Sequence, residues 1–232
     1  MNAHPKTAAL IETIPAHPPA SVTAHRLVSA AKSLLPHFEA GQAIDAESLR
    51  AAMETAFGAS DTNGAWVWKD AYDAVEIAQI MMILRYGALM QKQASSPGQF
   101  LSMVERLSAL APSHTRRSED SVRLQQFSTP LPLAAIVAEA AGFRAIDLVL
   151  EPSAGTGMLA VFGQIAGADI ALNELAGVRR GTLRALFAGA PVSGHDAASI
   201  DDRLDRAITP SVIVMNPPFS AAQHVDGKFR KA

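Results

Sequence analysis

The stretch Glu151-Pro152-Ser153-Ala154-Gly155-Thr156-Gly157 decides the expected fold, because it directly follows the apolar run of residues 146–150. An apolar run of this length is typical of a buried strand, and a glycine turn after it is typical of the loop at the strand's carboxyl end. A second apolar run, residues 212–215, ends in the same way at Asn216-Pro217-Pro218-Phe219. Both segments are therefore expected at the carboxyl edge of an open parallel sheet, where such sheets bind ligands.

The second half of the chain alternates between strand-like and helix-like segments. The predicted strands are residues 145–150, 169–172, 191–193 and 211–215. The predicted helices are residues 131–141, 158–166 and 176–187. Strands that alternate with helices favour βαβ units with right-handed crossovers in a doubly wound parallel sheet. The expected fold class is therefore α/β, and the sheet is expected to be incomplete after its fourth strand.

The first half of the chain carries only the helical period. Residues 1–20 hold several prolines and nothing periodic, and are predicted to be a flexible arm. Residues 21–124 are predicted to form an all-α domain, in which we find no catalytic constellation. Its predicted helices run from Ser21 to before Gly41, from Asp45 to Gly58, and over residues 66–92 and 98–110. Residues 125–232 are the predicted α/β domain.

Composition and charge limit the function classes. The chain has 232 residues, of which 49% are apolar, so it can bury a substantial core. A net charge of −2 gives no global attraction to nucleic acid, so such binding would need a local patch or a partner. The absence of cysteine excludes disulfides, and the seven histidines lack ligand spacing, so no metal site is predicted. Because the most apolar window, residues 77–90, is broken by Arg85 and is short, we expect a soluble cytoplasmic protein without a membrane segment.

The glycine loop has two interpretations. Gly155 and Gly157 allow a tight turn and a close approach of the backbone to a ligand, and the next helix offers free N–H groups. An ordinary strand-to-helix turn explains the loop equally well when it is taken alone. The spacing does not complete the dinucleotide fingerprint, and the Gly-Lys-Ser/Thr of a phosphate-binding loop is missing.

Acidic residues at successive strand ends favour a nucleoside cofactor. Glu174 follows the second strand, where a carboxylate can accept from both ribose hydroxyls. Asp196 follows the third strand, where it can accept from the amine of an adenine. Glu151 follows the first strand, where it can orient the loop or hold the amino-acid end of a cofactor through water. Taken alone, Glu174 is also explained as a solvated acid at a helix start, and Asp196 as a loop or capping residue.

The segment Asn216-Pro217-Pro218-Phe219 suits a flat amine substrate. Its two prolines fix the backbone and remove donors, which leaves the Asn216 side-chain oxygen and the Pro217 carbonyl as acceptors. An exocyclic amine has two hydrogens to donate to such a pair, and its lone pair is then directed toward an electrophilic methyl group. Phe219 can stack on a base that has left its helix. A rigid turn that merely ends the strand is the alternative.

The order of three segments carries a resemblance to a known family. Phe127-Ser128-Thr129-Pro130, then Glu151 to Gly157, then Asn216 to Phe219, resembles the S-adenosylmethionine-dependent amino-methyltransferases of DNA, of the adenine-N6 type. The resemblance implies a Rossmann-like methyltransferase fold and a catalytic role for Asn216, Pro217, Pro218 and Phe219. It implies cofactor contacts for Phe127, Thr129, Pro130, Glu151, Pro152, Ser153, Ala154, Gly155, Thr156, Gly157, Glu174 and Asp196.

A narrower resemblance extends into the helical half. Gly64-Ala65-Trp66, Arg116-Arg117-Ser118-Glu119 and Gln125 to Pro130 make the chain similar to bacterial strawberry notch-type proteins, which are often carried on mobile elements. Those proteins join a methylase-like region to a downstream helicase-like ATPase. The resemblance implies DNA and that ATPase region as partners. It also implies a C-terminally incomplete methyltransferase domain, because complete relatives continue through three more strands.

Several alternatives remain open at this level. Related tetrapeptides also occur in enzymes that methylate cytosine N4, RNA bases or protein glutamine, so these substrates remain alternatives. A catalytically inactive fragment or a non-catalytic interaction module of a larger methylase/helicase protein is the second class of function. Neither the target sequence nor the oligomeric state follows from the residues.

Overall fold

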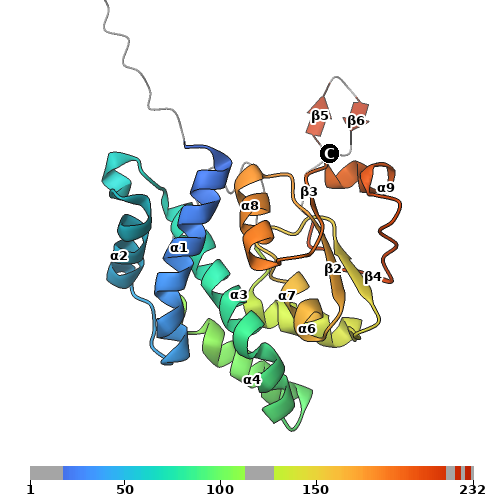
Figure 1. Ribbon diagram of the computed structural model, residues 1–232, viewed down its shortest axis with the longest axis horizontal. Coiled ribbons are helices and arrows are strands. Elements are labelled where there is room, and N and C mark those ends of the chain that lie inside the picture. Colours follow the sequence, from blue (N-terminus) through green and yellow to red (C-terminus); the bar gives the residue numbers. More distant parts are fainter. Residues whose placement is uncertain (1–17, 113–127, 218–222, 226–227, 231–232) are drawn as a thin grey trace, which may run out of the picture.

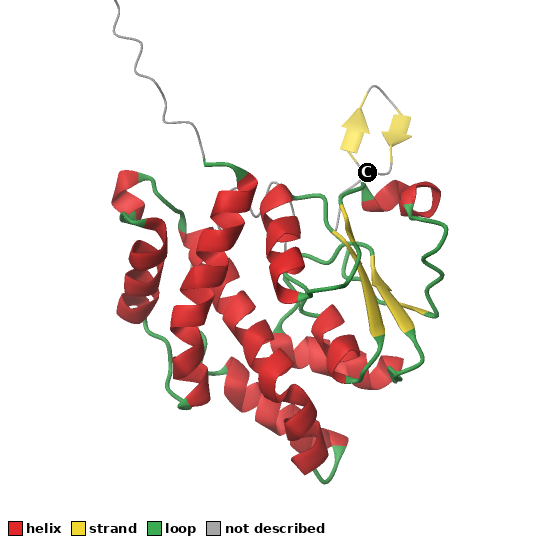
Figure 2. Ribbon diagram, viewed as in Figure 1, coloured by secondary structure: helices red, strands yellow, loops and turns green. Residues whose placement is uncertain are grey.

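A computed structural model gives the fold, and it describes residues 18–112, 128–217, 223–225 and 228–230. The first part is helical, as expected (Figure 2). Its elements are α1 (Ala20–Glu39), α2 (Ala46–Phe57), the 3-10 turn η1 (Asp61–Asn63), α3 (Trp68–Gln93) and α4 (Pro97–Ser108).

The ends of α2 follow from local chemistry. The Asp45 carboxylate accepts a hydrogen bond from the Ser48 amide at 2.8 Å, which satisfies one of the free N–H groups at the start of the helix. Gly58 ends the helix with φ of 78°, in the left-handed region that glycine adopts without strain. The predicted cap and stop are both confirmed.

The second part alternates helices and strands. Its elements are α6 (Leu131–Ala141), β1 (Leu148–Glu151), α7 (Ala160–Ile165), β2 (Asp169–Asn173), α8 (Gly177–Leu186), β3 (Val192–Ser193), η2 (Ala197–Ser199), α9 (Ile200–Arg203) and β4 (Val212–Ile213). β5 (Gln223–Val225) and β6 (Lys228–Arg230) form a separate antiparallel pair. The α/β class is confirmed.

The four strands β1–β4 form a parallel sheet in the order β3-β2-β1-β4. In the register, Val149 lies opposite both Ile170 of β2 and Val212 of β4. This order is that of the first four strands of doubly wound nucleotide-binding sheets. The chain runs outward from β1 through β2 to β3 and then returns to the other side of β1, so the strand order reverses between β1 and β4.

Three strands are shorter than predicted, and β3 differs only in beginning at Val192 and not at residue 191. Residues 145–147 form a turn, because the buried Asp147 carboxylate accepts from the Arg144 amide at 2.8 Å and from the Ser211 hydroxyl at 2.9 Å. β4 is a strand only over Val212–Ile213, although the Val214 amide still bonds to the Leu150 carbonyl at 3.0 Å. At the start of β1, bonds of the Asp147 side chain thus hold a turn where a strand was predicted, although the Asp147 carbonyl still accepts from the Asp169 amide at 3.0 Å.

One buried apolar core extends across the predicted domain boundary. Figure 1 shows α1–α4 on one side, the sheet on the other, and α6, α7 and α8 between them. α7 packs closely on the sheet, because a Cβ on Gly163 would lie 3.0 Å from Ile170 and 3.3 Å from Val149. The core cluster includes Leu27 of α1 and Ile80 of α3 together with Phe162 of α7. The division at residues 124–125 stays a prediction, since those residues lie outside the described ranges. Among the described helices, none combines the length and apolarity needed to cross a bilayer.

The close approach of α1 to α8 gives a first prediction. A Cβ on Gly181 in α8 would lie 2.7 Å from the Cβ of Ala24, which is nearer than packed carbons come. Gly181→Ala is therefore expected to cost about 1–3 kcal/mol of unfolding free energy through overpacking. Gly98→Ala in α4 is the control, because its Cβ meets only Ser96 Oγ at 4.0 Å. Urea unfolding of both variants should give a lower midpoint for the first and an unchanged or higher midpoint for the second. Equal midpoints would contradict the close packing.

Candidate functional site

The glycine loop joins β1 to α7 at the carboxyl edge of the sheet. Gly155 and Gly157 adopt φ of 56° and 94°, in the left-handed region that strains other residues. A Cβ on Gly157 would lie 2.5 Å from the Phe187 ring and 3.0 Å from Leu183. Gly157 is therefore required by the packing of the loop against α8, which is a reason that the loop sequence alone does not show.

Glu174 ties the loop after β2 to the glycine loop. One carboxylate oxygen accepts from the Gly155 amide at 2.8 Å, and the other accepts from the Ala176 amide at 2.7 Å. The residue is 8% exposed. A carboxylate has about four acceptor positions, so these two N–H groups leave acceptor capacity for hydroxyls of a ligand. The predicted ribose-binding acid thus also fixes the shape of the loop.

Glu151 lies beneath the start of α7. Its carboxylate is buried and accepts from the Ala160 amide at 2.9 Å, at the first turn of the helix. Burial raises the pKa of Glu151 well above its usual value; the Ala160 hydrogen bond opposes this rise, and the charge of Glu174 adds to it. In this geometry Glu151 orients the loop and the helix that follows it.

Asn173, at the end of β2, holds three strand ends together, and sequence reasoning missed it. Its amide nitrogen donates to the carbonyls of Pro152 and His195, each at 2.8 Å. Its amide oxygen accepts from the Ser193 hydroxyl and the His195 amide, each at 2.8 Å. Because the side chain is buried and fully hydrogen-bonded, it fixes the loops after β1, β2 and β3. A lone asparagine ending a buried strand was the only signal for it.

Asp196 lies on the loop that Asn173 holds. Its side chain is exposed, and one oxygen accepts from the Ala198 amide at 3.0 Å, so it caps η2. Ser153 is half-buried, and Pro152, Ala154 and Thr156 are buried, as parts of the same loop. The predicted cofactor residues of the strand ends therefore all lie along one edge of the sheet.

Asn216 and Thr129 meet although 87 positions separate them. The Asn216 amide nitrogen donates to the Thr129 hydroxyl at 3.1 Å, which leaves the amide oxygen as the acceptor. Pro130 follows Thr129, and its carbonyl accepts from Ala134 in the first turn of α6. Pro217 is exposed. The predicted residues Phe127, Pro218 and Phe219 lie outside the described residues.

A buried charged cluster connects α3 to the glycine loop, and sequence reasoning also missed it. Asp73 accepts from Lys69 Nζ at 2.7 Å and from Arg179 Nη2 of α8 at 3.0 Å. One turn further along α3, Glu76 accepts from the Thr156 hydroxyl at 3.1 Å. The only signal was the presence of two acids just before the most apolar window of α3, residues 77–90, and acids at such positions also fit a solvated face.

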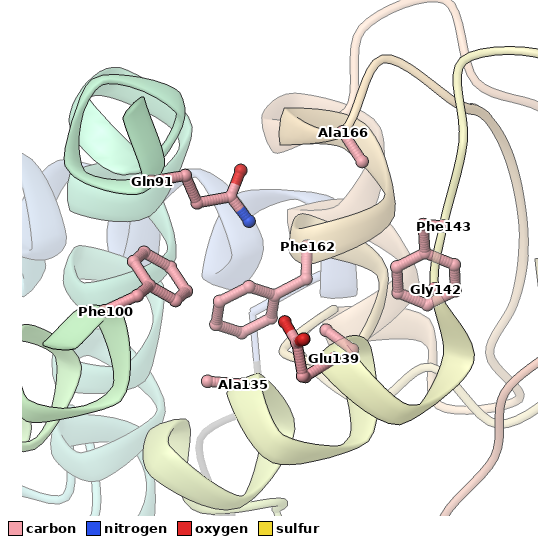
Figure 3. A pocket seen from close by; sticks show the side chains of 9 residues that line it. Gln91, Phe100, Ala135, Glu139, Gly142, Phe143, Phe162 and Ala166 are labelled. Carbon is pink, nitrogen blue, oxygen red and sulfur yellow. The ribbon is translucent and has the colours of Figure 1, made fainter. Parts of the chain in front are cut away.

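A cavity of about 160 Å³ lies away from these residues, near the amino ends of the strands. Figure 3 shows the rings of Phe100 of α4 and Phe162 of α7 side by side in its lining, with Gln91 and Glu139 near them. The two rings meet edge to face with centroids 6.3 Å apart. Among the described residues, none that was predicted for the cofactor or the catalytic tetrapeptide lines this cavity.

Comparison of the chain with protein-family models, with curated proteins and with solved structures found no significant match.

Proposed function

We propose that the chain contains the cofactor-binding part of a Rossmann-like S-adenosylmethionine-dependent methyltransferase. Its substrate would be an exocyclic amine of a nucleobase, and the preferred candidate is the N6 amine of adenine in DNA. The observation that carries this proposal is the position of two segments at the reversal of strand order. The glycine loop follows β1 and Asn216 follows β4, its neighbour in the sheet. Open α/β sheets bind ligands at such a switch point.

The donor and acceptor groups at this edge fit the cofactor. Glu174 keeps acceptor positions for the two ribose hydroxyls while it holds the Gly155 amide. Asp196 presents an exposed carboxylate on the next loop, where an adenine amine can donate to it. Held here, S-adenosylmethionine would supply a methyl group activated by a sulfonium centre.

Asn216 and Pro217 would orient the substrate amine. The Asn216 amide oxygen and the Pro217 carbonyl would accept the two amine hydrogens, so that the nitrogen lone pair points toward the methyl group. The bond from Asn216 to Thr129 supports this role, because it fixes which end of the amide is free to accept. Positioning and preorganised acceptors then lower the barrier without a strong base. A base in a duplex would have to leave the stack to reach this edge.

Calorimetric titration with S-adenosylmethionine tests the cofactor site. We expect the parent chain to bind, and Asp196→Ser to bind about ten- to a hundred-fold more weakly, because a hydrogen bond to a charged group contributes roughly 1.5–3 kcal/mol. Serine keeps a capping oxygen for η2, so the loop is expected to persist. Asp201→Ser removes an exposed acid from α9 nearby and should bind like the parent. No binding to the folded parent, or equal losses in both variants, would contradict the proposal.

The outer side of β4 favours a second candidate function, that of an interaction module. Within the described residues β4 pairs only with β1, and Ile213 and Met215 are each 53% exposed. An unpaired strand edge beside exposed apolar side chains is a site where another chain can add a strand. Co-purification with a helicase-like ATPase region would support this function, and the absence of any complex would contradict it.

A further inference from the structure

Glu76 of α3 contacts two segments of the proposed site, the glycine loop and the segment that contains Ser128. Its carboxylate accepts from the hydroxyl of Thr156 in the glycine loop, at 3.1 Å. A second hydrogen bond links its side chain to Ser128, which directly precedes Thr129. One carboxylate of the helical part therefore joins the two segments that the family resemblance assigns to the cofactor.

The surroundings of Glu76 argue against a purely stabilising role. The side chain is buried, and burying a carboxylate is unfavourable unless it is paired. Arg179 of α8 is near enough to attract it, but the Nη2 of Arg179 bonds to Asp73. Glu76 is thus held by hydroxyl groups of two loops, and because buried charged groups can often be replaced by apolar residues without loss of stability, stability alone does not account for a carboxylate here.

We propose that Glu76 is a positioning residue of the cofactor site, which holds the Ser128 segment and the Thr156 loop at a fixed separation while its carboxylate is ionised. This inference rests on the proposed function. When ionised, the carboxylate accepts from both hydroxyls. When protonated, one of its oxygens becomes a donor and the negative charge is lost, so the carboxyl holds the two hydroxyls more weakly.

The charges around Glu76 place this change near neutral pH. Burial and the neighbouring Asp73 raise the pKa of Glu76 to about 7, against the opposing effects of Arg179 and of the Ser128 and Thr156 hydrogen bonds. Lys69 faces Asp73 on α3, and Glu174 faces Arg179 from the loop after β2. Cofactor affinity is therefore expected to fall as the pH drops through 7.

Ionisation of Glu76 is expected to raise cofactor affinity but to lower the stability of the folded state. The pKa of Glu76 lies above its ordinary value of 4.5, so the folded state binds the proton more tightly than the unfolded state. Its contribution to stability is fully present below pH 4.5 and is lost as the pH rises through about 7. As the pH rises, a positioning role therefore predicts that affinity increases while stability decreases, whereas a purely structural role predicts no such increase in affinity.

The experiment measures S-adenosylmethionine affinity at pH 6 and pH 8 for the parent, Glu76→Gln, and Glu105→Gln as an exposed control on α4. With a pKa of about 7, the ionised fraction of Glu76 falls from roughly nine tenths at pH 8 to roughly one tenth at pH 6. We expect up to about a ten-fold loss of affinity in the parent and in Glu105→Gln, and a much smaller pH effect in Glu76→Gln. An identical pH profile in Glu76→Gln would overturn the inference.

A cofactor-free readout separates this inference from the proposed function. The protection of the Thr156 and Gly157 amides, which is their exchange rate relative to the intrinsic rate at the same pH, should change with a midpoint near pH 7 in the parent and not in Glu76→Gln. If the parent binds no cofactor, the proposed function fails, and this midpoint still decides whether Glu76 positions the loop. If Glu76→Gln does not fold, Thr156→Ser should keep the midpoint and Thr156→Val should lose it. The absence of a midpoint near pH 7 in the parent would overturn the inference.

Discussion

Asp73→Leu is expected to destabilise the fold by about 3–5 kcal/mol, because it leaves the buried Arg179 charge without the carboxylate that accepts its hydrogen bond. Arg179 is 7% exposed, and among the described residues its Nε already has no hydrogen-bond partner. Burial acts to raise the pKa of Asp73, but the charges of Arg179 and Lys69 outweigh it, and the pKa lies below its usual value. This contribution to stability is present above the ordinary pKa and is lost as the pH falls through the lowered one.

A double variant provides the matched control for this loss. Asp73→Leu combined with Arg179→Met removes both charges, and similar buried pairs have been replaced by apolar residues without net loss. Denaturant unfolding should therefore show that the double variant is more stable than the single one. Glu39→Gln removes the exposed Arg85–Glu39 pair and should cost within about 1 kcal/mol. A double variant as unstable as Asp73→Leu would show that the cluster contributes through packing and not through charge pairing.

Local signals in the sequence are sufficient to place most elements. The helical period, the Asp45 cap and the stop at Gly58 predict α2 because these interactions involve residues within one turn of each other. The glycine turn after an apolar run predicts β1 and its loop for the same reason. The first strand was predicted too long at its start, since the bonds of Asp147 to Arg144 and Ser211 compete with the ladder there. Nothing in residues 145–147 signals a partner so distant in the sequence.

The parts of the site that the sequence did not predict depend on contacts between distant elements. Asp73 follows Lys69 by four positions, which is the spacing of an ordinary solvated helix pair. Only the folded chain buries this pair and brings the Arg179 side chain of α8 to Asp73, at 3.0 Å. Asn173 likewise has its role only because the fold brings the carbonyls of Pro152 and His195 within hydrogen-bonding distance of its side chain. The carboxyl edge was predictable, while the network that supports it needed the fold.

Asn216→Ala is expected to reduce methyl transfer to DNA by about a hundred- to a thousand-fold, which is the typical effect of removing one preorganised group that acts on the reacting atoms. Affinity for S-adenosylmethionine should remain nearly unchanged. The reason is that the Asn216 amide oxygen would accept from the substrate amine, whereas the bonds to Gly155, Ala160 and Thr156 that shape the glycine loop do not involve Asn216.

Single-turnover transfer of labelled methyl groups, measured beside calorimetric binding, separates these two effects. Thr129→Val is the informative companion, because it removes the hydroxyl that accepts from Asn216 at 3.1 Å while the Asn216 amide remains. We expect Thr129→Val to lose part of the transfer rate, and Asn216→Ala with Thr129→Val to be no slower than Asn216→Ala alone, since the two residues act as one unit. Parallel loss of cofactor affinity and transfer in Asn216→Ala would contradict its role on the amine. A parent that binds the cofactor but transfers no methyl group would favour the interaction module at β4.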